Sequence, residues 1–179
     1  MPQTDPSTHV STGRDRLVVM GVSGCGKSTL AQAIARHLHW TMIEGDTYHT
    51  QDSQAKMAQG MALTDEDRAQ WLHTLAHMIE QADAPLVMAC SALKNDYRDI
   101  LRRAAPGEVG FVYMDLTQEE SFRRVSQRKG HLFPASLVAS QFAALQSPRG
   151  EPDVLTVDAT ASTQEQLAEV LRWLGCDPD

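Results

Sequence analysis

The chain of 179 residues has no long hydrophobic run, no internal repeat and no cluster of basic residues. No stretch approaches the roughly 18 consecutive apolar residues that cross a bilayer, so we expect no membrane partner. It contains 16 Lys and Arg residues and 23 Asp and Glu residues, which gives a formal net charge of −7. A surface of that sign repels phosphate backbones, so the composition argues against nucleic acid as a partner. A small anionic substrate held in one basic pocket suits this balance better.

Cysteine is scarce as well, with only Cys25, Cys90 and Cys176. Their odd number and wide spacing match no disulfide framework and no metal-ligand pattern, so we predict reduced thiols and a cytoplasmic protein. Residues 1–14 are polar and contain no apolar segment, which predicts a disordered lead-in rather than a signal peptide. Residues 15–179 are long enough for one domain with a full core and short for two.

Residues 21–28 carry the clearest functional signal. They read Gly-Val-Ser-Gly-Cys-Gly-Lys-Ser and fit the phosphate-loop pattern Gly-x4-Gly-Lys-[Ser/Thr] at every fixed position. An apolar run precedes them and a helical pattern follows, so the motif joins a buried strand to a helix. A glycine-rich turn before an unrelated helix is the alternative, but it would not require so many fixed positions. We therefore predict that the chain binds a nucleoside triphosphate.

The chemistry of the motif assigns roles to its residues. Glycine lets the backbone curl so that N–H groups point at an anion, and the helix N-terminus adds partial positive charge. Lys27 would bridge the β- and γ-phosphates, and the Ser28 hydroxyl would hold Mg²⁺. The predicted ATP-binding residues of this loop are Gly21, Val22, Ser23, Gly24, Cys25, Gly26, Lys27, Ser28 and Thr29.

Apolar runs alternate with helical patterns along the rest of the chain. The predicted strands are 16–20, 41–43, 86–90, 110–114 and 154–157. The predicted helices are 27–39, 65–81, 95–103, 118–128, 135–146 and 163–174. Thr117 with Glu120, and Ser162 with Glu165, have the spacing of capping boxes. This alternation predicts an α/β fold, with a parallel five-stranded sheet between two helical layers and ligands at the carboxyl ends of the strands.

Polar residues follow the second and third predicted strands. Asp46 could take a proton from a substrate hydroxyl or order water around Mg²⁺, although a solvated turn is the alternative. Ser91 either caps the next helix or contacts the substrate. Lys94 either meets an anionic group or is an ordinary surface lysine.

The connection between these two strands is much longer than a crossover loop requires. We predict that residues 47–80 form an insertion that binds the phosphate acceptor. Lys56 and Arg68 are its cations, and the planar fork of Arg68 suits a carboxylate or a phosphate. The apolar residues of its helix are expected to be core: Trp71, Leu72, Leu75 and Ile79.

A lid is predicted at residues 124–146. Arg124 and Arg128 are four residues apart, hence on one helix face, and could stack on adenine and neutralise phosphate charge. Solvent-facing arginines are the alternative. Residues 129–134 read as a hinge, in which His131 is a packing residue or a ligand contact.

Together these segments resemble the small P-loop gluconokinases, relatives of shikimate and nucleoside-monophosphate kinases. The resemblance covers roughly residues 17–157 and rests on motifs that include Glu-Gly-Asp ending at Asp46, then His49, Lys-Met-x-x-Gly from Lys56, Cys-Ser-Ala-Leu-Lys ending at Lys94, and Ser-Gln-Phe around Gln141. The family usually has proline where this chain has Thr50, Ala62 and Gln70, and asparagine where it has Ser53. We expect the proline changes to affect rigidity, and Ser53 to affect an acceptor contact.

The resemblance implies a three-layer P-loop NTPase fold of the nucleoside-monophosphate-kinase type. It implies ATP- and Mg²⁺-dependent phosphorylation of D-gluconate to 6-phosphogluconate, feeding the pentose phosphate pathway, by a homodimer. The implied catalytic residues are Lys27, Asp46 and Arg128, with Arg124 and Arg128 over ATP. The implied acceptor-binding residues are Asp46, His49, Lys56, Arg68, Ser91 and Lys94. A kinase of another small acceptor, or a non-catalytic ATP-binding module, remains an alternative.

Overall fold

The computed structural model describes residues 13–129 and 134–178. Five parallel strands form one sheet in the order β2-β3-β1-β4-β5. β1 (Arg16–Met20) lies at the centre, between β3 (Leu86–Ala89) and β4 (Val109–Asp115). β2 (Thr41–Glu44) and β5 (Val154–Asp158) form the two edges. The predicted parallel five-stranded sheet is confirmed.

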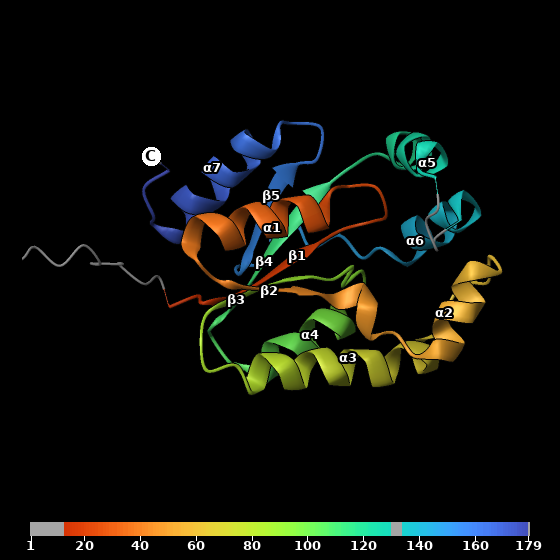
Figure 1. The fold of residues 1–179 in the computed structure, drawn as a ribbon, viewed down its shortest axis with the longest axis horizontal. Coiled ribbons are helices and arrows are strands. Elements are labelled where there is room, and N and C mark those ends of the chain that lie inside the picture. Colours follow the sequence, from red (N-terminus) through yellow and green to blue (C-terminus); the bar gives the residue numbers. More distant parts are fainter. Residues whose placement is uncertain (1–12, 130–133, 179) are drawn as a thin grey trace, which may run out of the picture.

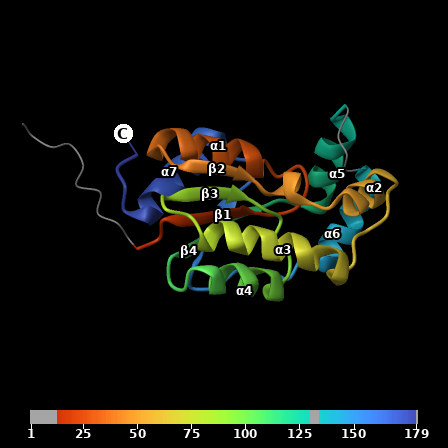
Figure 2. The ribbon, with the colours of Figure 1, turned by 60° about the horizontal axis from the view of Figure 1, so that its bottom comes forward.

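Helices cover both faces of this sheet, as Figures 1 and 2 show. α1 (Lys27–Leu38) and α7 (Thr163–Leu174) lie on one face. α3 (Asp65–Glu80) and α4 (Asn95–Ala104) lie on the other face. The predicted three-layer arrangement is therefore confirmed.

The two hydrophobic cores follow from the alternation of side chains along β1. Leu17 and Val19 belong to the core beneath α1 and α7, whereas Val18 and Met20 belong to the core beneath α3 and α4. All four side chains are fully buried. A strand covered on both faces needs an unbroken apolar run, which is the pattern of this segment. The predicted core residues of α3 are also buried: Trp71, Leu72, Leu75 and Ile79.

Shorter elements gather beyond the carboxyl ends of the strands. They are η1 (Gly45–Tyr48), α2 (Gln51–Ala58), α5 (Gln118–Gln127), η2 (Ala135–Leu137) and α6 (Val138–Ala144). Figure 1 shows α2, α5 and α6 together at the end of the molecule opposite the C-terminus. Among the described residues, no helix has both the length and the apolar character to cross a membrane.

The structure differs from the sequence prediction in two places. The first is α2, which was not predicted because its sequence has no apolar stripe; Ser53 is its only buried residue. The helix predicted at 135–146 is a 3₁₀ turn followed by α6, which ends at Ala144. Most of the predicted lead-in (1–12) and most of the predicted hinge (130–133, with His131) lie outside the described residues.

Candidate active site

Residues 21–28 join β1 to α1 as the motif predicts, and close packing requires glycine at two of these positions. Gly21 has φ +143°, and a Cβ there would lie 2.9 Å from the carbonyl oxygen of Met114. Gly24 has φ +79°, and a Cβ there would lie 3.3 Å from the Cβ of Arg124 in α5. The positive φ disfavours a side chain at both positions, lack of space excludes one at Gly21, and a Cβ at Gly24 would be in tight contact with α5. The loop therefore packs directly against β4 and α5.

The start of α1 leaves backbone N–H groups open at this loop. In a regular helix the carbonyl of Ser23 would accept from Lys27 N–H, but here it accepts from Ser121 Oγ of α5 at 2.7 Å. The carbonyl of Gly24 likewise accepts from Arg124 Nη1 at 3.2 Å. Among the residues that the structure describes, the Lys27 N–H has no acceptor. These groups form an anion-binding site at a helix N-terminus.

The side chains of Lys27 and Ser28, the last two residues of the motif, point to phosphate and metal chemistry. Lys27 Nζ donates to the carbonyl of Val22 at 3.0 Å, and the Ser28 hydroxyl donates to the Glu44 carboxylate at the end of β2. Oxygen ligands of this kind suit Mg²⁺, which takes one or two protein oxygens together with substrate phosphates and water. Within 13–129 and 134–178, no group of three or more His, Cys, Asp or Glu residues could hold a metal. Ser28 and Glu44 therefore fit a magnesium ion that phosphate oxygens help to hold.

A cavity of about 830 Å³ opens in front of the loop. Most of the predicted site residues line it: Ser23, Gly24, Gly26, Lys27, Ser28, Thr29, Asp46, His49, Arg68, Ser91 and Arg128. A second cavity of about 410 Å³ adjoins it, sharing Gly24, Gly26, Thr29 and Arg128 and adding Arg124. The pair of cavities has room for a nucleotide and a second small molecule, with the loop between them.

Asp46 is placed by the packing of the residue before it. Gly45 O accepts a hydrogen bond from Trp71 Nε1 at 2.8 Å. A Cβ at Gly45 would lie 2.4 Å from the carbonyl oxygen of Ala89, so the ends of β2 and β3 are in close contact. The Asp46 side chain is 66% exposed and lines the larger cavity. Its carboxylate is thus available to a ligand.

We expect Gly45→Ala to destabilise the fold, because the added methyl group meets a backbone carbonyl that cannot move without disturbing β3. Overpacking of this kind costs about 1–3 kcal/mol of unfolding free energy. Urea unfolding monitored by circular dichroism would measure the loss. An unchanged urea midpoint would show that β2 and β3 separate at this point with little cost.

His49 forms the wall of the cavity beside Asp46. Its ring stacks on Trp71 with centroids 4.1 Å apart, and its side chain is 7% exposed. Nε2 lies 4.0 Å from Asp46 Oδ1, whereas the buried Nδ1 has no hydrogen-bond partner in the described part of the chain. Burial lowers the pKa of His49 and the Arg68 charge lowers it further, against an opposing contribution from Asp46. The imidazole is therefore neutral near pH 7 and offers one donor and one acceptor.

This lowered pKa makes His49 a source of acid sensitivity. The folded-state pKa lies below the ordinary value of 6.5, so the unfolded chain takes up the proton first as the pH falls. Stability is thus lost on acidification through and below that value. We expect His49→Phe, which keeps the stacking on Trp71, to reduce the fall in melting temperature between about pH 7.5 and about pH 5.5. An equal fall in both proteins would contradict this assignment.

The three predicted acceptor cations occupy different positions. Arg68 lines the larger cavity and donates to the carbonyl of Leu63. Lys56 lies 2.6 Å from Asp67, and Lys94 lies 2.7 Å from Asp65; neither lysine lines the cavity. Hydrogen bonding to these carboxylates raises the pKa of both lysines. Both ammonium groups therefore join the first turn of α3 to neighbouring segments.

The two predicted lid arginines also differ. Arg124 contacts Glu120 at 2.7 Å and donates to the carbonyls of Gly24 and Ala159 at 3.2 Å, so it links α5 to the loop and to the end of β5. Hydrogen bonds from the neighbouring arginines lower the pKa of Glu120 to about 2. Arg128 lines both cavities and forms no ion pair within the described residues. Its guanidinium remains available to a phosphate.

Comparisons with known proteins agree with this geometry. A family described as an AAA domain matches residues 17–152. The gluconokinase of Gluconobacter oxydans (strain 621H) is 40% identical over 173 residues, which covers 94% of this chain and 96% of that protein. The thermoresistant gluconokinase of Escherichia coli (strain K12) is 40% identical over 158 residues, covering 86% and 90%. The chain belongs to the gluconokinase family.

Solved structures give the same assignment. A gluconokinase from Sinorhizobium meliloti 1021 superimposes with a TM-score of 0.82 at 40% identity, covering 89% of this chain and 91% of that one. A shikimate kinase from Bacteroides thetaiotaomicron superimposes with a TM-score of 0.63 at 17% identity, and this likeness concerns the fold alone. The chain is thus a P-loop kinase of the gluconokinase family.

One departure from the family pattern has a structural explanation. Thr50 is the N-cap of α2, where its hydroxyl accepts from Ser53 N at 3.1 Å and donates to Ser53 Oγ at 3.0 Å. Ser53 is 2% exposed and does not line the cavity. The Ser53 hydroxyl is thus used within the helix cap, and the expected effect of Ser53 on an acceptor contact stays a prediction.

Sequence reasoning assigned no role to Gln141 of α6. It lines the larger cavity, and its Oε1 accepts a hydrogen bond from Ser23 N–H at 2.6 Å. The only available signal was its place in the Ser-Gln-Phe motif. The spacing of 118 residues between the two partners gives no indication that they meet.

Proposed function

We propose that this chain is an ATP-dependent gluconokinase that transfers the γ-phosphoryl group of ATP to the terminal hydroxyl of D-gluconate. The products are 6-phospho-D-gluconate and ADP. Membership of the gluconokinase family supports the acceptor. The reaction class is supported by one cavity that contains both Lys27 of the phosphate loop and the exposed carboxylate of Asp46.

On the donor side, charge and backbone groups bind the triphosphate. Lys27 keeps one N–H on the Val22 carbonyl and bridges the β- and γ-phosphates with the other two, next to the open N–H groups at the start of α1. Ser28 and Glu44 are the residues that would hold Mg²⁺, which when bound neutralises charge on the phosphates. Arg128 stabilises the transferring phosphoryl group, and Arg124 borders the cavity that takes the nucleoside.

On the acceptor side, carboxylate chemistry and hydrogen bonding orient the sugar acid. Arg68 pairs with the gluconate carboxylate through its planar fork. His49 and Ser91 offer hydrogen bonds to hydroxyl groups along the cavity wall. Asp46 orients the attacking hydroxyl and accepts its proton. Lys56 and Lys94 would contribute only after leaving their partners Asp67 and Asp65.

The deciding experiment is ADP release in a coupled assay with purified protein, Mg-ATP and a panel of acceptors. The panel contains D-gluconate, other aldonates, shikimate and nucleoside monophosphates. ADP formed with gluconate alone supports the proposal. Turnover with a different acceptor would support the proposed kinase activity but contradict gluconate as its substrate. ATP binding without turnover on any acceptor would indicate a binding module.

The oligomeric state and the cellular role of the protein complete the proposal. We propose that the protein acts as a homodimer in the cytoplasm, in gluconate utilisation that feeds the pentose phosphate pathway. Size-exclusion chromatography with light scattering would measure the oligomer directly. A monomeric mass over the working concentration range would contradict the dimer.

A further inference from the structure

The N–H groups of the phosphate loop fall into two sets. Three are occupied by protein acceptors: Gly21 N–H donates to Ser91 O and Cys25 N–H to Val22 O, both at 3.3 Å, and Ser23 N–H donates to Gln141 Oε1. The N–H groups of Gly24, Gly26 and the first residues of α1 have no such acceptor in the described part of the chain. The second set remains for phosphate oxygens. Gln141 therefore binds an N–H group of the loop that is separate from the N–H groups left open for phosphate.

The hydrogen bond from Ser23 has a particular geometric effect. Ser23 N–H and Val22 O belong to the same peptide unit, and in a trans peptide these groups point in opposite directions. Lys27 Nζ lies 3.0 Å from the carbonyl end, and Gln141 Oε1 lies 2.6 Å from the N–H end. Ser121 holds the next carbonyl, that of Ser23. The peptide that holds the Lys27 ammonium is thus oriented from α6.

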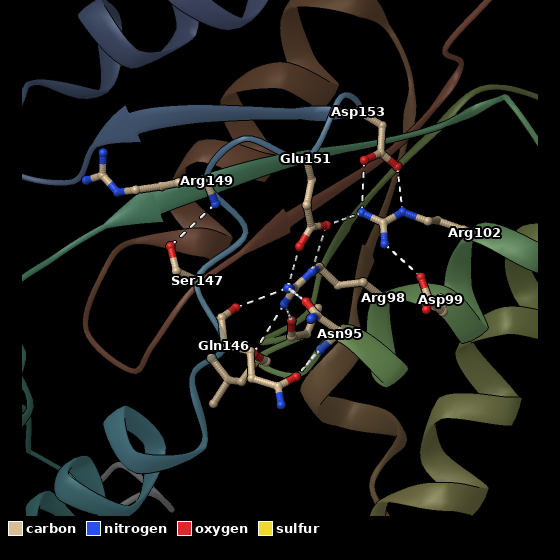
Figure 3. A network of polar contacts seen from close by, with 11 residues as sticks. Asn95, Arg98, Asp99, Arg102, Gln146, Ser147, Arg149, Glu151 and Asp153 are labelled. Atoms are coloured by element: carbon tan, nitrogen blue, oxygen red, sulfur yellow. Dashed lines mark hydrogen bonds and ion pairs between the residues drawn. The ribbon is translucent and has the colours of Figure 1, made fainter.

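The segment that directly follows α6 is itself fixed. Gln146 N–H donates to Leu93 O at 2.8 Å, and Gln146 Oε1 accepts from Asn95 N–H at 2.6 Å. Arg98, whose side chain is fully buried, donates to Gln146 O at 3.0 Å and contacts Glu151 at 2.7 Å (Figure 3). This network connects the segment after β3 with the segment after α6. Gln141 therefore projects from a short helix whose C-terminal end is firmly anchored.

We propose that Gln141 is a positioning residue of the donor site. By accepting the Ser23 N–H, it holds the Val22–Ser23 peptide in the orientation that places Lys27 for the γ-phosphoryl group. The inference rests on the proposed function only for the identity of the donor and the reaction. The required chemistry at position 141 is a hydrogen-bond acceptor, not a positive charge and not a donor.

Four variants test this chemistry. Gln141→Glu keeps an acceptor at the same reach, Gln141→Met removes it without charge, and Gln141→Lys replaces it with a cation. Gln164→Met is the matched control, because Gln164 is exposed on α7 and lines neither cavity. We expect kcat/KM for ATP to fall about tenfold in Gln141→Met, the size of one lost hydrogen bond. The expected order is Gln, then Glu, then Met and Lys, with the KM for gluconate changing less than about twofold.

The opposite order of activity among the Gln141 variants would indicate a direct contact between Gln141 and phosphate. If the Gln141 amide instead donated to a phosphate, Lys would retain activity and Glu would be the worst variant, because its charge repels phosphate. That order, or unchanged kinetics in Gln141→Met, would overturn the proposal. Melting temperatures should stay within about 4 °C, which separates positioning from a loss of fold.

A second measurement does not depend on the acceptor. Amide hydrogen exchange of Ser23, followed by NMR in the ligand-free protein, should be slow in the wild type and in Gln141→Glu and fast in Gln141→Met. Affinity for a non-hydrolysable ATP analogue should fall in Gln141→Met without any gluconate present. If the wild type fails to phosphorylate gluconate, these results still decide the role of Gln141. Equal Ser23 exchange in the wild type and Gln141→Met would overturn it.

Discussion

Replacing Lys27 with alanine is expected to lower gluconate-dependent ADP release by about a thousandfold or more. In the transition state the negative charge of the phosphoryl group is spread over its three equatorial oxygens and charge develops on the leaving ADP, and Lys27 is the cation of the loop placed to stabilise both. Lys27 already lines the cavity, and its Nζ donates to the Val22 carbonyl at 3.0 Å and to Cys25 Sγ at 3.9 Å. The N–H groups of the loop would remain, so nucleotide binding should weaken much less than turnover. Single-turnover phosphoryl transfer with labelled ATP would measure the effect.

Arg103→Ala is the matched control for this loss of positive charge. Arg103 is exposed on α4 and lines neither cavity, so its removal should leave turnover within about twofold, as for most surface substitutions. A Lys27→Ala protein with near-normal turnover would refute the proposed mechanism. A loss of turnover shared equally by both variants would point to a long-range effect of net charge.

Asp46→Asn is expected to lower kcat by about a hundredfold to ten-thousandfold, because an amide cannot accept the proton of the attacking hydroxyl. The side chain is exposed to the cavity and isosteric with asparagine, so the fold and the KM for gluconate should change little. The dependence of kcat on Mg²⁺ concentration separates two roles. An unchanged Mg²⁺ requirement identifies Asp46 as the proton acceptor, whereas a raised requirement indicates that it orders water around the ion.

Asp83→Asn serves as the control for Asp46, since Asp83 is exposed before β3 and lines neither cavity. Its kcat should match that of the wild type. If Asp46→Asn retains kcat within about twofold, general-base catalysis at this position is excluded and the carboxylate serves another purpose.

The sheet and the phosphate loop could be predicted because their signals are local. An unbroken apolar run, a glycine-rich turn and a helical stripe are adjacent in the sequence, so each strand-to-helix unit is visible in one window. The side chains that meet across the cavity could be only partly predicted. The position of Lys56 depends on Asp67, and that of Lys94 on Asp65, and these pairings form only when α2, α3 and α4 pack together.

The predicted capping boxes show the same limit. Ser162 and Glu165 form the reciprocal pair at the start of α7. Thr117 accepts from Glu120 N–H, but the Glu120 carboxylate contacts Arg123 and Arg124 instead of returning to the N-cap. Spacing indicates that two groups can meet, and competition from neighbouring cations decides whether they do.

The contacts of Trp71 bear on how this enzyme family can change its acceptor. One indole supports the ring of His49 in the cavity wall, holds Gly45 O beside the proposed base, and is buried in the core under α3. A substitution that reshapes the acceptor pocket here also removes core packing, which costs about 3–5 kcal/mol for the loss of a large aromatic side chain. New acceptor specificity is therefore more accessible through Arg68 or Ser91, whose replacement leaves the hydrophobic interior intact.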